Sequence, residues 1–136
     1  MHSCFTYGSL MCEDIFGLVT GLSMQGVPAR LEGYSRHPVI DADYPGIRTA
    51  LGAHVPGMLY RDVPALGLAR LDQFEGTEYL RESVQVRLED GTVESAWVYV
   101  FHPDQLHRLA LGDWDFEHFL AEGKARFLQR HPPAPL

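Results

Sequence analysis

The chain has 136 residues, of which 46% are hydrophobic and 21% charged, the length and composition of one soluble globular domain. Its formal net charge is −7, and a negative field repels phosphate backbones, so nucleic acid is not an expected partner. Apolar stretches such as residues 97–101 are far shorter than the ~20 residues of a membrane helix, and the first residues resemble no signal peptide. We therefore expect a single domain over residues 1–136 that stays in the cytoplasm and contacts no membrane.

In the first half of the chain, strands and helices are expected to alternate. A strand through Phe5 and Tyr7 meets a break at Gly8-Ser9, and apolar residues between Met11 and Val19 then recur at helical spacing up to Gly21. The elements expected next are strands over residues 27–34, 36–41 and 54–63, followed by a helix from Pro64 to about Phe74 that ends at Gly76.

The second half of the chain contains a predicted hairpin and a predicted final helix. Residues 83–88 and 93–101 alternate in polarity, and the Asp90-Gly91 turn signal joins them. The helix is expected over about residues 114–130, ending before Pro132-Pro133. Its apolar face carries Phe116, Phe119, Leu120, Phe127 and Leu128. Because strands outnumber helices and only one βαβ-like unit is present, we predict an α+β fold, a small mixed sheet or partly closed barrel with flanking helices.

Cysteine and histidine spacing indicates neither a disulfide nor a metal centre. Cys4 and Cys12 are the only cysteines, and two cysteines in a chain expected in the cytoplasm are more often free thiols. The sequence has no His-x-x-x-His or Cys-x-x-Cys pair, and His102 and His107 lie on either side of Pro103. We expect no bound metal.

The segment from Tyr7 to Met11 is the first candidate site. Gly8 lacks a Cβ, so a ligand could approach the main chain, and the N–H groups of Ser9, Leu10 and Met11 would point outward at the start of the predicted helix. Such a turn suits a small carboxylate. The alternative is structural: Ser9 caps the helix and Gly8 permits the turn. A nucleophilic Ser9 is a third interpretation, but Tyr7 and Met11 stand where a Gly-x-Ser-x-Gly elbow needs glycines.

The end of the second predicted helix is the other candidate site. Asp72 and Glu75 lie close to Gly76, at the negative end of the helix dipole, where cations are normally favoured. The dipole and the neighbouring carboxylates would raise the pKa of a carboxyl group there, as suits a general base. The alternative is an exposed salt-bridge cluster with Arg70 or Arg81. Sequence reasoning alone leaves both interpretations open.

Several short motifs together resemble the γ-glutamylcyclotransferase-like family, also called the AIG2-like family. They are Tyr7-Gly8-Ser9-Leu10, then Leu71-Asp72-Gln73-Phe74-Glu75-Gly76, then Tyr79-x-Arg81 and the aromatic strand that holds Tyr99. The segments Tyr44-Pro45-Gly46 and Val55 to Tyr60 are also similar, so the resemblance covers about residues 4–102. The helix from Trp114 to Leu128 resembles a tail seen in bacterial members, which suggests a small, bacterial-type member.

The resemblance implies a small mixed barrel with a cavity at one end, in which a γ-glutamyl amide closes to 5-oxoproline and releases its amine. Glu75 matches the family's catalytic acid/base. The positions that match substrate-binding residues are Tyr7, Gly8, Ser9, Leu10 and Tyr99. Tyr79 and Arg81 match supporting positions, and Arg81 would orient Glu75 or an acidic neighbour. Met11-Cys12 departs from members that carry a basic residue or glycine there, which leaves the leaving-group preference open.

This chemistry needs no metal or organic cofactor, because the substrate's own α-amine attacks its side-chain carbonyl. One carboxyl group can take a proton from that amine and return one to the departing amine. The only expected partner is thus a small γ-glutamyl substrate. The alternative is a non-catalytic module that binds a small acidic or amino-acid-like ligand in the same cavity. No heptad seam or apolar patch in the sequence indicates an oligomeric state.

Overall fold

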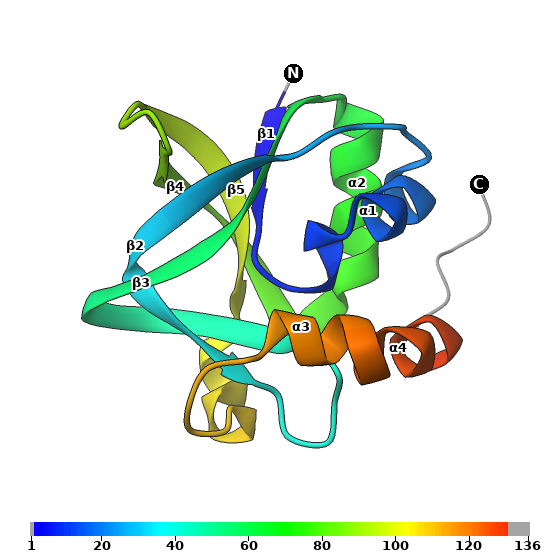
Figure 1. Ribbon diagram of the computed structural model, residues 1–136, viewed down its shortest axis with the longest axis vertical. Helices are drawn as coiled ribbons and strands as arrows, with labels where there is room; N and C mark the ends of the chain where they lie inside the picture. The colour runs from blue at the N-terminus through cyan, green and yellow to red at the C-terminus, as the bar shows by residue number, and fades with distance from the viewer. Residues whose placement is uncertain (1, 131–136) are drawn as a thin grey trace.

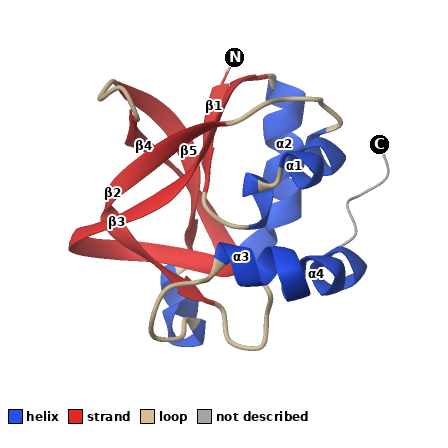
Figure 2. Ribbon diagram, viewed as in Figure 1, coloured by secondary structure: helices blue, strands red, loops and turns tan. Residues whose placement is uncertain are grey.

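The computed structural model describes residues 2–130, whose five strands form a closed barrel with helices on the outside (Figures 1 and 2). The strands are β1 (His2–Thr6), β2 (Val27–Pro38), β3 (Pro45–Val63), β4 (Tyr79–Leu88) and β5 (Val93–Phe101). Their order around the barrel is β1-β3-β2-β4-β5, and a parallel pairing of Cys4 with Trp97 brings β1 and β5 together. The predicted α+β fold with a small barrel is confirmed.

The long pair β2 and β3 departs from the prediction. Residues 27–34 and 36–41 were expected as two strands, but residues 27–38 form one strand that pairs antiparallel with β3. The boundary expected between residues 34 and 36 is absent, and the irregularity in this strand is instead at Gly33, which has φ +85° and lies at a register shift. The chain reverses only near Asp41, with φ +63°, so β3 begins at Pro45, well before the expected residue 54.

The helices of the first half lie against one wall of the barrel (Figure 1). The predicted first helix is divided into a 3-10 turn, η1 (Ser9–Met11), and α1 (Glu13–Thr20), which ends at Gly21 with φ +77°. The second helix, α2 (Ala65–Glu75), ends at Gly76 as predicted, and the short 3-10 turn η2 (Gly76–Glu78) leads into β4.

The C-terminal part of the described chain returns to these helices. After the 3-10 helix η3 (Pro103–Arg108), a continuous helical segment consists of α3 (Phe116–His118), the π-helical turn η4 (Phe119–Gly123) and α4 (Lys124–Arg130). The predicted start at residue 114 is two residues early, and the predicted end before Pro132 lies outside the described residues.

Two apolar clusters meet at one end of the barrel. One fills the barrel and includes Phe5, Tyr7 and Leu59. The other, between the barrel and the helices, includes Leu10 and Phe127. Cys4 and Cys12 are free and buried in this outer cluster. Within residues 2–130 we find neither a helix long and apolar enough to cross a membrane nor a group of three side chains suited to a metal ion.

Candidate active site

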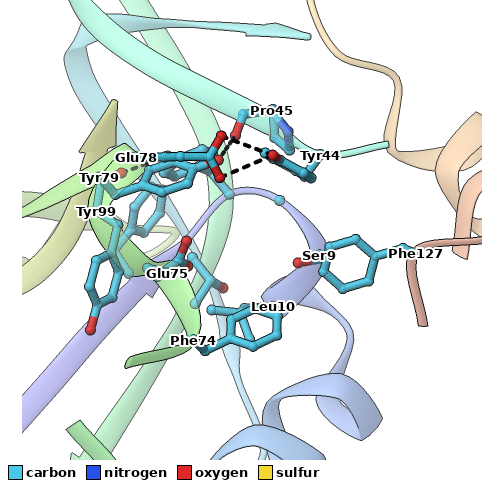
Figure 3. A pocket seen from close by; sticks show the side chains of 14 residues that line it. Ser9, Leu10, Tyr44, Pro45, Phe74, Glu75, Glu78, Tyr79, Tyr99 and Phe127 are labelled. Atoms are coloured by element: carbon cyan, nitrogen blue, oxygen red, sulfur yellow. Dashed lines mark hydrogen bonds between the residues drawn. The ribbon is translucent and has the colours of Figure 1, made fainter. Parts of the chain in front are cut away.

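A pocket of about 560 Å³, partly open to solvent, lies where the two apolar clusters meet (Figure 3). Both candidate segments of the sequence contribute to its wall, although more than sixty residues separate them. The predicted site residues that line it are Tyr7, Gly8, Ser9, Leu10, Glu75, Tyr79 and Tyr99. Arg81 is the one predicted site residue outside this lining within the described chain.

The turn after β1 exposes part of its backbone to the pocket. The N–H of Met11 donates to the carbonyl of Gly8 at 3.0 Å, within the turn. This N–H group is therefore not available to a ligand, contrary to the prediction. The N–H groups of Ser9 and Leu10 precede that first bond and are not needed by the turn itself. Neither η1 nor α1 has a side-chain cap, so the interpretation of Ser9 as a helix cap is wrong.

Gly8 is required for a reason that the sequence did not indicate. A Cβ at this position would lie 2.8 Å from Cδ of Pro45, at the start of β3. Real Cβ atoms do not approach that closely, so a side chain here would push the turn away from β3. Close packing against Pro45 thus gives a structural reason for the glycine, and its predicted role in ligand approach stays a prediction.

A buried arginine holds the same turn from behind. Nη1 of Arg36 donates to the carbonyl of Tyr7 at 2.9 Å, and its Nε pairs with Oδ1 of Asp113 at 2.8 Å. The Tyr7 hydroxyl in turn donates to the carbonyl of Tyr99 at 2.6 Å. These bonds tie the turn to β2, β5 and the segment that precedes the C-terminal helix. Sequence reasoning missed Arg36, since nothing in its strand context indicates burial.

Glu75 presents the titratable carboxyl group of the pocket. It is the last residue of α2 and is half-buried. Burial, and then the nearby carboxylates of Glu78 and Asp72, raise the pKa of Glu75 from 4.5 to about 8. Each cause disfavours a further negative charge, so the group exchanges a proton near neutral pH. The predicted rise in carboxyl pKa agrees with this environment.

Asp72 belongs to a different arrangement. Its Oδ1 accepts from Nε of Arg81 at 2.8 Å and from the hydroxyl of Tyr99 at 2.7 Å. The guanidinium of Arg81 lies 4.3 Å from the ring centroid of Trp97. The salt-bridge interpretation therefore holds for Asp72 and not for Glu75. Arg81 orients an acidic neighbour of Glu75, and through it the ring of Tyr99.

Tyrosine hydroxyls brace the pocket wall rather than reach into the cavity. The Tyr99 hydroxyl is bonded to Asp72, so its ring lines the pocket while its oxygen faces another carboxylate. The Tyr79 hydroxyl donates to the carbonyl of Pro45 at 2.7 Å, which joins β4 to the start of β3. A direct hydrogen bond from the Tyr99 hydroxyl to a ligand would require the bond to Asp72 to break.

The pocket also contains residues that sequence reasoning left without a role. Glu78 accepts from the Tyr44 hydroxyl at 3.0 Å and pairs with Nη1 of Arg108 at 2.7 Å. Phe74 and Phe127 add aromatic rings. The spacing of Asp72, Glu75 and Glu78 at intervals of three was a usable signal for Glu78; Phe127 had only its place on an apolar face. The described lining includes no Lys, Arg or His, so an anionic ligand there must rely on neutral donors, namely backbone N–H groups and hydroxyls such as that of Ser9.

A model of the family described as "Gamma-glutamyl cyclotransferase, AIG2-like" matches residues 4–116 of this chain. The chain belongs to this family. The match extends past residue 102, where the resemblance in the sequence was expected to end.

Curated AIG2-like relatives cover most of the chain. AIG2-like protein D of Arabidopsis thaliana is 36% identical over 123 residues, which are 86% of this chain and 78% of that protein. Protein AIG2 B of the same plant is 30% identical over 130 residues, 94% of this chain and 76% of that protein. Because these relatives are plant proteins, they give no support to the expected bacterial-type subgroup.

Solved structures of AIG2-like and cyclotransferase proteins share the fold. A solution structure of a protein from Arabidopsis thaliana superposes with a TM-score of 0.74 at 27% identity, covering 95% of this chain and 78% of that one. A structure named gamma-glutamyl cyclotransferase superposes with a TM-score of 0.66 at 17% identity, covering 99% and 90%. At that identity the likeness establishes the fold alone.

The family match ends at residue 116, so Phe127, which lines the pocket, lies beyond the part of the chain that the family model covers.

Proposed function

We propose that the protein is a γ-glutamylcyclotransferase, which closes a γ-glutamyl amide to 5-oxoproline and releases the amine. The observation that carries the proposal is the carboxyl group of Glu75, which faces a pocket beside the backbone of Ser9 and Leu10 and has a pKa raised to about 8. Membership of the γ-glutamylcyclotransferase, AIG2-like family supports the same reaction class.

The substrate's α-carboxylate binds at the turn after β1. The N–H groups of Ser9 and Leu10 are the donors that the turn leaves over, and backbone N–H groups bind carboxylates without a cationic side chain. Arg36 and Pro45 hold that turn in place, by a hydrogen bond to Tyr7 and by contact with Gly8. The donors are therefore positioned before the substrate arrives, which reduces the ordering cost of binding.

Glu75 moves the proton that cyclisation requires. The substrate amine enters as an ammonium, and the Glu75 carboxylate takes one proton from it. The freed amine nitrogen attacks the γ-carbonyl carbon, so a C–N bond forms and closes the five-membered ring. Glu75 returns its proton to the departing nitrogen as the original amide C–N bond breaks. The ring nitrogen still carries a second proton from the ammonium, which it gives to the regenerated Glu75 carboxylate, and the released amine then takes up that proton. A pKa near 8 suits both directions of transfer, since acid and base forms coexist at neutral pH.

The reaction is tested by the release of 5-oxoproline from a panel of γ-glutamyl amino acids and γ-glutamyl amines. We expect release by the wild type and a loss of at least ~100-fold in kcat for Glu75→Gln, which keeps the shape of the side chain but cannot carry the proton. Glu82→Gln is the matched control, because Glu82 is an exposed glutamate outside the pocket.

Two outcomes contradict the proposal. Full activity in a folded Glu75→Gln protein would remove Glu75 from the chemistry. Thermal stabilisation of the wild type by 5-oxoproline without turnover of any γ-glutamyl compound would indicate a non-catalytic binding module.

A further inference from the structure

The C-terminal helix supplies one wall of the pocket. Phe127 on α4 is 3% exposed and lines the pocket. Its ring meets the rings of Tyr44 and Phe74 edge-on, with centroids 6.3 and 6.0 Å apart. Figure 3 shows these three aromatic side chains around the part of the pocket next to Ser9. This aromatic wall, Tyr44, Phe74 and Phe127, is distinct from the Glu75 carboxyl group and the backbone donors.

The π-helical turn aims Phe127 at the pocket. Eight residues separate Phe119 from Phe127, and in a regular helix of 3.6 residues per turn that spacing leaves two side chains about 80° apart. The i→i+5 turn at Phe119–Gly123 contains one extra residue, which reduces the rotation between the two side chains by about 100°. The two rings therefore share one face of the helix, with centroids 5.7 Å apart.

Two ion pairs hold α4 in place through residues just before Phe127. Nζ of Lys124 lies 2.8 Å from Oδ2 of Asp14, in the first turn of α1. Nη2 of Arg126 lies 2.8 Å from Oδ1 of Asp43, the neighbour of Tyr44 in sequence. The helix is thus attached both to the element that follows the substrate-binding turn and to the loop that carries part of the aromatic wall.

The chemistry of this wall suits the leaving group. If the glutamyl part of the substrate occupies Glu75 and the backbone of Ser9 and Leu10, the described lining that remains for the leaving amine includes the aromatic wall. A carboxylate there would lose water without gaining a cationic partner from the described pocket lining, and it would face the carboxylate of Glu78. An apolar body would gain burial against the rings.

We infer that the aromatic wall is the leaving-group subsite, that Phe127 is its specificity-determining residue, and that the released amine carries a flat apolar body and no carboxylate. The inference rests on the proposed cyclisation, whose glutamyl half it leaves unchanged.

The test compares kcat/KM for three substrates: γ-glutamylbenzylamide, γ-glutamylmethylamide and γ-glutamylglutamate. For the wild type we expect the benzylamide to exceed each of the others by ~10-fold or more. Phe127→Ala is expected to lower kcat/KM for the benzylamide by ~10-fold and to leave the methylamide within ~3-fold, because methylamine does not reach the ring.

Two further variants separate recognition from folding. Leu120→Ala removes a half-exposed apolar side chain from the same helical segment outside the pocket, and the substrate preference is expected to persist. Phe127→Leu keeps most of the apolar volume and is expected to retain an intermediate preference, which provides the readout should the alanine variant not fold.

The contradicting outcomes are distinguishable. An equal loss for benzylamide and methylamide in a folded Phe127 variant would make the residue structural and overturn its role in specificity. A wild-type preference for γ-glutamylglutamate would overturn the leaving-group class while leaving the cyclisation intact. Absence of 5-oxoproline from all three substrates and from the wider γ-glutamyl panel would overturn both this inference and the proposed function.

Discussion

Glu75 and Asp72 lie one helical turn apart, yet the fold gives them different partners. Asp72 faces Arg81 on β4 and the hydroxyl of Tyr99 on β5, and its Oδ1 accepts a hydrogen bond from each. Glu75 faces the pocket, where burial and the carboxylates of Glu78 and Asp72 favour its protonated form. The groups that lie beside each side chain therefore decide that Asp72 makes structural hydrogen bonds and that Glu75 has a raised pKa.

The acid limb of the pH–rate profile is expected to report Glu75. In the free enzyme its carboxylate must form before it can accept a proton, so kcat/KM should rise with pH through an apparent pKa of about 8. Glu78→Gln removes a carboxylate that raises the pKa of Glu75, so the limb should shift to lower pH. The measurement is kcat/KM for one γ-glutamyl amide from pH 5.5 to 9.

Asp104→Asn is the control for this shift, because Asp104 is an exposed acid outside the pocket. Its profile should coincide with that of the wild type. Superimposable acid limbs for the wild type and Glu78→Gln would contradict the electrostatic role assigned to Glu78.

At the scale of the elements, the end of α2 places Glu75 through a glycine. Gly76 adopts φ +70° and ψ −153°, a conformation that only glycine adopts without strain. No atom lies within 4 Å of the position that a Cβ would occupy, so substitution is opposed by backbone strain and not by crowding. The abrupt end of the helix allows the chain to turn into η2 and β4 directly after the catalytic candidate.

Gly76→Ala is therefore expected to destabilise the protein by about 1–3 kcal/mol and to lower kcat by shifting Glu75. Gly91→Ala is the matched control. Gly91 has φ +90°, also has open space at its Cβ position, and lies in the β4–β5 turn away from the pocket. Both variants should lose stability in urea unfolding, and only Gly76→Ala should lose activity. Equal activities would show that the glycine serves stability alone.

The sequence predicted elements well where the local signal and the tertiary contacts agree. Asp90-Gly91 and Gly76 specify a hairpin and a helix end by backbone conformation alone, and both predictions are confirmed. The division expected between residues 34 and 36 was wrong, because β2 pairs with β3 from Val27 to Pro38, and the irregularity in this pairing lies at Gly33. The continuity of β2 depends on its partner strand, which the local sequence does not reveal.

For the site, sequence patterns could single out the turn at Ser9 and the acidic end of α2 as candidates, since both stand at ends of elements. The choice of Glu75 over Asp72 came from the family resemblance. Sequence patterns could not indicate Arg36 or Phe127. The burial of Arg36 depends on Asp113, and the orientation of Phe127 depends on a π-helical turn, for which the sequence offered no recognisable signal.

At the scale of the whole molecule, the pocket has a cost in stability. The pKa of Glu75 is about 8 in the folded protein and 4.5 in its ordinary state, so the folded chain binds the additional proton between these values. Stability is then unaffected below about pH 4.5 and falls as the pH rises to about 8, because deprotonation places a charge among buried and acidic surroundings. This loss of stability would accompany the proposed acid/base role of Glu75.

Glu75→Gln is expected to remove this pH dependence. The difference in Tm between the variant and the wild type should be smallest near pH 4.5, increase in favour of the variant up to about pH 8, and remain level above it. Glu82→Gln, which changes an exposed side chain of β4, should follow the wild type throughout. A constant difference across this range would mean that Glu75 titrates near its ordinary pKa in the folded protein. The acid/base role would then lack the electrostatic environment on which it depends.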